Sequence, residues 1–334
     1  MKKKILSLVL TVLLITGNIS LIFGWGFWAH QRINRAAVFA LPDSMRLFFY
    51  NHIDFITQEA QMPDVRIYAL EYRGEANRHY INAELLHSSL QEVPQTMAGA
   101  VAKYGDSLVQ KAGLLPWYID ETMTKLTKAF AEKNKPYILF HAADLAHYLG
   151  DAHVPLHTTL NHDGVSTGQK GIHSFWESEL PEYLGGSFNF NTANASYIPD
   201  VKKEIWRIIE NSNKLVDTVL LKEKDLQTGF PSDQVYVMDS AGKVMKNRYN
   251  QTRHSFVYSQ KYNELLNGMV EQQLRSSISA AANFWYTAWV NSGRPDLTAL
   301  DPEALTKSNR KPFKKELSLW KKGQLFGLKT ATEF

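Results

Sequence analysis

Apolar residues recur every three or four positions along most of the chain, which is the spacing of amphipathic helices. In one such stretch, Leu47, Phe48, Ile53 and Ile56 follow this interval. The pattern predicts helices over residues 31–41, 45–61, 94–112, 117–132, 137–150, 201–221 and 260–290. Only residues 234–245, which alternate around a turn, favour a small β-hairpin. The expected fold class is therefore all-α, a single bundle-like domain.

The two ends of the chain differ from this pattern. Three lysines and a largely apolar run, residues 5–15, precede residues 16–24, and this order is typical of a cleaved signal peptide. We expect cleavage before Trp25 and export to a periplasm or the outside, with an uncleaved N-terminal anchor as the alternative. The main domain would then span residues 25–295, and residues 296–334 would form a basic C-terminal extension.

The extension interleaves many lysines with Phe313, Leu317, Trp320 and Leu325. Such a segment can make peripheral contact with an anionic membrane surface. A solvated, partly disordered tail is the alternative that the lysine content favours.

Composition narrows the chemistry further. The chain has 334 residues, of which 44% are hydrophobic and 21% charged, and these fractions are typical of a globular protein. A net charge of only +4 does not by itself indicate nucleic-acid or membrane binding. Cysteine is absent, so disulfides and thiolate metal sites are excluded. Any bound metal must take nitrogen and oxygen ligands.

One stretch carries the strongest chemical signal. His147 and Asp151 are four residues apart, so on a helix they project from the same face. Pro155 ends that helix, and the turn it forces can bring His157 back toward the same point. A second pair with the same spacing, His173 and Glu177, follows a glycine-containing loop. These residues predict a metal site.

Other candidate ligands are ambiguous on their own. His30 lies just after the expected new N-terminus at Trp25, whose amine and carbonyl can chelate a metal; alternatively, the tryptophan-rich start covers the core and His30 caps a helix. Asp64 and His79 flank a loop expected to be irregular, where functional residues are over-represented, yet polar loop residues are commoner than ligands. We take His52 as a surface or satisfied core residue.

The stretch from His147 to His157 resembles the signature of zinc-dependent bacterial phospholipases C, His-Tyr-x-Gly-Asp-x-x-x-Pro-x-His, at every fixed position. The related zinc-dependent single-strand nucleases (nuclease/3′-nucleotidases) share this core. The signature continues with an Asn three places after the last His, where this chain has Leu160 and places Asn161 one position late. The resemblance extends from Trp25 to about residue 295, with its motifs between Trp25 and Glu177.

The resemblance implies a mostly helical fold with three Zn2+ ions in one cleft. By matching positions, a first zinc would bind Asp64, His79, His147 and Asp151, and a second would bind His157, His173 and Glu177. A third would bind the amine and carbonyl of Trp25 together with His30, and Asp151 would bridge. Nitrogen and oxygen ligands fit zinc, with manganese or iron as alternatives.

The implied activity is hydrolysis of phosphoric esters by metal-activated water, with Asp64 and Asp151 as catalytic residues. The substrate would be phospholipid, or alternatively single-stranded nucleic acid or nucleotide. Glu177 resembles the phospholipases, whereas the spacing of Trp25 and His30 resembles the nucleases. Val65 stands where choline-binding phospholipases carry an aromatic residue, which argues against a choline cage. A non-catalytic, exported zinc-binding protein is the alternative of another class, and no obligate protein partner is implied.

Overall fold

The computed structural model describes residues 25–69, 74–86, 89–247 and 251–324. The predicted all-α fold class is confirmed: these residues form one helical domain with a continuous buried core. In this described part there is no regular strand; residues 236–254 contain three isolated antiparallel bridges, one of which, between Met238 and Val244, lies in the expected hairpin. The signal-peptide prediction concerns residues 1–24, which lie outside the described residues.

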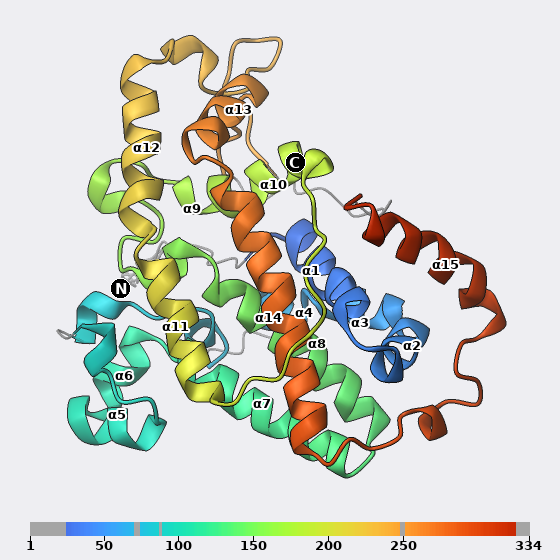
Figure 1. Ribbon diagram of the computed structural model, residues 1–334. Helices are drawn as coiled ribbons and strands as arrows, with labels where there is room; N and C mark the ends of the chain where they lie inside the picture. The colour runs from blue at the N-terminus through green and yellow to red at the C-terminus, as the bar shows by residue number, and fades with distance from the viewer. Residues whose placement is uncertain (1–24, 70–73, 87–88, 248–250, 325–334) are drawn as a thin grey trace, which may run out of the picture.

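Four helices form the centre of the molecule. They are α1 (Phe27–Ala40), α7 (Leu115–Ala131), α8 (Lys135–Ala152) and α14 (Met269–Asn291), which runs across α1 and α8 (Figure 1). Small side chains at Ala142, Ala143 and Ala146 on α8 are fully buried and permit this close packing. The Asn134 side chain accepts a hydrogen bond from the Tyr137 amide and caps α8 at its N-terminus.

Several long helices predicted from the sequence are each divided into two shorter helices in the structure. Residues 45–61 divide at His52 into α2 (Asp43–Asn51) and α3 (Ile53–Glu59), and residues 260–290 belong to α13 (Phe256–Leu265) and α14. The second break is a turn at Asn267 and Gly268, whose φ angles are 50° and 78°. Further divisions separate α5 (Met97–Tyr104) from α6 (Asp106–Ala112), and α11 (Val201–Asn213) from α12 (Val216–Gly229).

The remaining helices surround this centre. Helix α3 ends at Glu59, and Pro63 occupies the first turn of the next helix, α4 (Met62–Ala69), where proline is tolerated because its missing N–H has no helical partner. Asp64 therefore lies on a helix and not on an irregular segment. Two short helices follow α8, α9 (Ile172–Ser174) and α10 (Leu180–Leu184). No described helix combines the length and apolar character needed to cross a bilayer.

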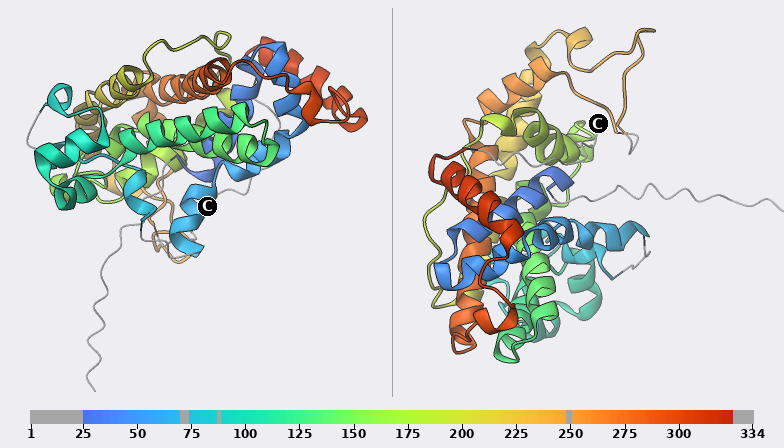
Figure 2. Two further views of the ribbon diagram at one scale, coloured as in Figure 1. Left: turned by 90° about the horizontal axis from the view of Figure 1, so that it is seen from below. Right: turned by 90° about the vertical axis from the view of Figure 1, so that its right-hand side faces the viewer.

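The C-terminal extension is ordered where the structure describes it. Its helix α15 (Lys307–Lys321) lies against α1 and α2 at the edge of the molecule (Figures 1 and 2). Phe313 contacts the ring of Tyr50, with a centroid distance of 4.8 Å, and Glu316 pairs with Arg35 at 2.6 Å. The expectation of a solvated tail is therefore wrong for residues 307–321, because their apolar face is packed. Residues 325–334 lie outside the described part.

Candidate metal centre

The last two turns of α8 present His147 and Asp151 toward one point. Both side chains are fully buried, and His147 Nδ1 lies 2.7 Å from the carbonyl oxygen of Ala60. That hydrogen bond fixes the ring and directs Nε2 to Asp151, with Oδ2 at 3.3 Å. The helical spacing of four residues therefore produces the juxtaposition that the sequence predicts.

The turn after α8 brings His157 back to the same region. The helix ends at Ala152, and Pro155 begins the 3₁₀ segment η4 (Pro155–Thr158). His157 Nδ1 donates to the carbonyl of His79 at 2.5 Å, while the amide of Ile81 donates to the carbonyl of His157. This reciprocal pairing holds His157 beside His79, although 78 residues separate the two.

Asp151 lies at the centre of the candidate site. Its Oδ2 is 2.9 Å from His79 Nδ1 and 3.3 Å from His147 Nε2. Its Oδ1 is 3.4 Å from His30 Nε2 and 3.9 Å from His157 Nδ1. Because the two oxygens face different histidines, this carboxylate can bridge two metal ions.

The first ligand group contains Asp64, His79 and His147, all buried. Asp64 Oδ1 lies 3.6 Å from His79 Nδ1 and 3.8 Å from His147 Nε2. Together with Asp151 Oδ2, these atoms make a set of two imidazoles and two carboxylates. Such a set suits a divalent ion with nitrogen and oxygen ligands.

His30 forms a second group with His147 and Asp151. The two imidazole rings are stacked, with centroids 3.8 Å apart. Since Nδ1 of His147 is engaged by Ala60, its one remaining nitrogen can serve a single metal, and Asp64 and His79 already face it. His30 therefore needs ligands from elsewhere, and the sequence prediction placed them in the backbone of Trp25.

Trp25 is fully buried beside this group. Its indole Nε1 donates to the carbonyl of Gly150 at 2.9 Å, and its ring lies 4.9 Å from that of Trp176. A methyl group at Gly150 would lie 3.2 Å from both the His30 ring and the Trp25 ring, so both rings can lie this close to α8 only because residue 150 has no side chain. The structure thus brings Trp25 and His30 together at Gly150 through their side chains, and not through the Trp25 backbone atoms that were expected to bind metal.

His157, His173 and Glu177 form the third group. Glu177 Oε2 lies 3.4 Å from His157 Nε2 and 3.0 Å from His173 Nε2. The expected helix carrying the last two residues is irregular: α9 passes into a π-helical turn, η6 (Phe175–Glu179). Such turns occur frequently at functional sites because they displace side chains from the regular helical face.

The electrostatics of the cluster favour a bound cation. Burial would raise the pKa of Asp151, but the charges of His147 and His157 lower it well below its usual value, so the carboxylate is ionised. Burial lowers the pKa of His79, yet the hydrogen bond to Asp151 and the nearby carboxylate of Glu75 raise it to about 10. The pKa of His30 falls to about 3 through burial and the neighbouring charge of His147, which leaves its imidazole neutral. Neutral imidazole is the form that binds metals.

The residues present fit a metal by a second criterion. Both ring nitrogens of His30 are buried, and within the described part of the chain neither has a hydrogen-bond partner. Leaving a buried polar atom without a partner costs about 1–3 kcal/mol, so such atoms point to a missing ligand. Carboxylates and imidazoles without thiolates suit zinc, with other divalent ions as alternatives.

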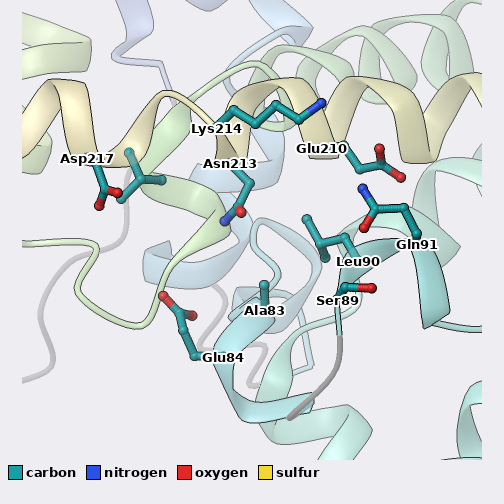
Figure 3. A pocket seen from close by; sticks show the side chains of 10 residues that line it. Ala83, Glu84, Ser89, Leu90, Gln91, Glu210, Asn213, Lys214 and Asp217 are labelled. Atoms are coloured by element: carbon teal, nitrogen blue, oxygen red, sulfur yellow. The ribbon is translucent and has the colours of Figure 1, made fainter.

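Two cavities border this region. A small one of about 70 Å³ is lined by Tyr80, Asn82, Leu156, His157, His162 and His173, and therefore reaches the third ligand group. A larger one of about 470 Å³ is lined from one side by residues 83–84 and 89–91 and from the other by residues of α11 and α12, and Glu84, Glu210 and Lys214 give it mixed charge (Figure 3). No residue of the three ligand groups lines the larger cavity. Of these two cavities, only the smaller one is therefore lined by candidate metal ligands.

The sequence prediction missed Glu75. This carboxylate is 1% exposed and accepts a hydrogen bond from the hydroxyl of Tyr148. It precedes His79 by four residues. The pairs His147–Asp151 and His173–Glu177 have the same spacing, but in them the histidine comes before the carboxylate. That spacing was the signal available in the sequence. The prediction for His52 holds: it pairs with Asp301 at 3.0 Å and belongs to none of the three ligand groups.

Comparisons with known proteins add no identification: no protein family, no curated protein and no solved structure matches the chain. The fold class and the possible metal groups therefore stand on the structure alone.

Proposed function

We propose that this protein is a metal-dependent hydrolase of phosphoric esters, with activity like that of the zinc-dependent phospholipases C. The observation that carries the proposal is the gathering of three buried ligand groups around Asp151. A structural metal site needs only one closed group of ligands, so several adjoining groups favour catalysis over a non-catalytic zinc-binding role. The resemblance of residues 147–157 to the phospholipase signature supports the same function.

Zinc ions bound in such a site lower the pKa of water to about 7 and stabilise charge on a phosphoryl oxygen. The residues of the chain would hold and orient the reactants. Asp151 fixes the spacing of two ligand groups through its two oxygens, and His157, His173 and Glu177 hold the third group beside the small cavity. We assign to Asp64 the acceptance of the proton from the attacking water.

Phospholipid is the substrate that we favour. The segment between His157 and His173 exposes two apolar side chains, Leu160 at 53% and Val165 at 64%. His162, which lies between them in sequence, lines the small cavity. An apolar rim near the cleft suits docking on lipid, whereas a single-strand nuclease requires stacking aromatics and basic residues along the phosphates.

The test compares substrates on the zinc-loaded protein. We expect hydrolysis of phospholipid vesicles, strong loss of activity in Asp64→Asn with retained fold, and little cleavage of single-stranded DNA. Leu160→Ser should reduce vesicle hydrolysis by about tenfold more than hydrolysis of a soluble phosphodiester, because burying one leucine contributes about 1.5–3 kcal/mol. Cleavage of DNA with inert lipid would favour the nuclease alternative. A protein that binds zinc but cleaves neither substrate would favour the non-catalytic one.

A further inference from the structure

We propose that Glu75 is a positioning residue of the metal centre, whose carboxylate holds the His79 ring so that Nδ1 faces the first ligand group. The inference rests on the proposed metal centre. Glu75 itself is not expected to bind a metal ion. It sets the orientation of the His79 imidazole and the strength with which that imidazole binds the metal.

The two nitrogens of His79 face opposite partners. Nδ1 lies 2.9 Å from Asp151 Oδ2 and 3.6 Å from Asp64 Oδ1, within the ligand group. Nε2 points away from that group and lies 3.7 Å from Glu75 Oε1. A carboxylate on the outer nitrogen favours the tautomer that is protonated there and leaves the inner nitrogen free for a metal.

Glu75 is itself held firmly. Its carboxylate accepts hydrogen bonds from the Tyr148 hydroxyl and from Arg78 Nη1 at 2.8 Å, and Arg66 Nε lies 3.5 Å away. These contacts come from α4, α8 and the η1 turn, so the Glu75 carboxylate is fixed in position from three sides.

This network joins the elements that carry the ligands of the first group. Tyr148 is on α8, directly after His147, and Arg66 is on α4, two residues after Asp64. Arg66 Nη2 also donates to Asp144 on α8 at 2.8 Å. Glu75 thus orients His79 relative to the other ligands and not only relative to its own loop.

His79 differs from the other histidines of the centre in the partner of its outer nitrogen. The outer nitrogens of His147 and His157 face backbone carbonyl oxygens, of Ala60 and His79 respectively. His79 faces a charged carboxylate, which makes its imidazole a stronger donor. Because this partner is a side chain and not a backbone carbonyl, a single substitution removes it and tests the contact directly.

The experiment measures Co2+ binding to the metal-free full-length protein by its visible absorption, in competition with a chelator. Glu75→Gln keeps the shape of the side chain but removes its charge, and we expect one bound equivalent to weaken by about 10–100-fold. The matched control is Glu223→Gln: Glu223 is 4% exposed and accepts the Tyr258 hydroxyl at 2.6 Å, but touches no ligand. The control should bind cobalt as the wild type does. Equal binding by wild type and Glu75→Gln, or equal losses in both variants, would overturn the inference.

A second readout is the ring nitrogen that binds the metal. In the zinc-loaded wild type, ¹⁵N NMR should report His79 with Nδ1 on the metal and a proton on Nε2, and the reverse assignment would contradict the proposal. If Glu75→Gln does not fold, Tyr148→Phe decides, since it removes one hydrogen bond that holds Glu75: weaker cobalt binding supports the inference and wild-type binding overturns it. A wild-type protein that binds no metal would instead overturn the metal centre itself.

Discussion

Replacing Gly150 with alanine tests whether His30 must approach α8 as closely as the structure shows. The added methyl carbon would lie 3.2 Å from His30 Cε1 and Trp25 Cδ1, and 3.3 Å from His30 Nδ1. Ordinary van der Waals contact begins near 3.5 Å, so both rings must move by a few tenths of an ångström. His30 would then lose its position relative to Asp151 Oδ1, now 3.4 Å from its Nε2.

The effects of Gly150→Ala on stability and on metal binding should separate. Alanine stabilises a helix by about 1 kcal/mol relative to glycine, whereas overpacking a core destabilises the protein by about 1–3 kcal/mol. The unfolding free energy should therefore fall by about 0–2 kcal/mol. Misplacing a ligand costs about 10–100-fold in metal affinity. We expect weaker binding of the metal held by His30, and wild-type binding by His157, His173 and Glu177.

The assay is a zinc titration of the metal-free protein, with urea unfolding of the same samples. Gly229→Ala is the matched control, because Gly229 also lies in a helix and an added methyl carbon there meets nothing within 4 Å. Wild-type zinc affinity in Gly150→Ala would refute the reasoning, since it would mean that His30 does not need this approach.

Three further changes test the site and the fold. Asp151→Asn should lower zinc content by more than one equivalent per chain, because its oxygens face two ligand groups; loss of a single equivalent on elemental analysis would contradict a bridging role. Trp285→Ala should lower the unfolding free energy in urea by about 3–5 kcal/mol, as Trp285 stacks on Phe49 at 5.0 Å, and a loss below 1 kcal/mol would be unexpected. Phe313→Ala should speed tryptic cleavage within residues 307–321 and leave zinc content unchanged; unaltered cleavage would show that α15 does not depend on this contact.

The sequence predicted the positions of the candidate ligands best where local geometry determines them. His147 and Asp151 share a helix face by spacing alone, and Pro155 determines the turn that returns His157. His30 and Trp25 were placed by resemblance to a family, because no local rule brings residues 25–30 to the end of α8. Glu75 was missed because it lies just before the short 3₁₀ segment η1 (Ala76–Arg78), in a stretch expected to be a loop, so its four-residue spacing from His79 was not read as a shared helix face.

The fold shows a similar division. Periodic apolar residues identified the central helices correctly, because burial against other helices requires that period. The breaks within predicted helices were missed: exposed Asn267 and Gly268 both adopt left-handed conformations, and this Asn-Gly pair is a local turn signal that the apolar period did not reveal. The helix that starts at Met62 was also missed, because a proline such as Pro63 can mark the end of one helix and lie in the first turn of the next.

The most direct test of the central claim is the metal content of the purified protein after equilibrium dialysis against zinc. If the buried groups around Asp151 hold metal ions, elemental analysis should give close to three zinc ions per chain, one for each ligand group. Less than one zinc ion per folded chain would contradict the account.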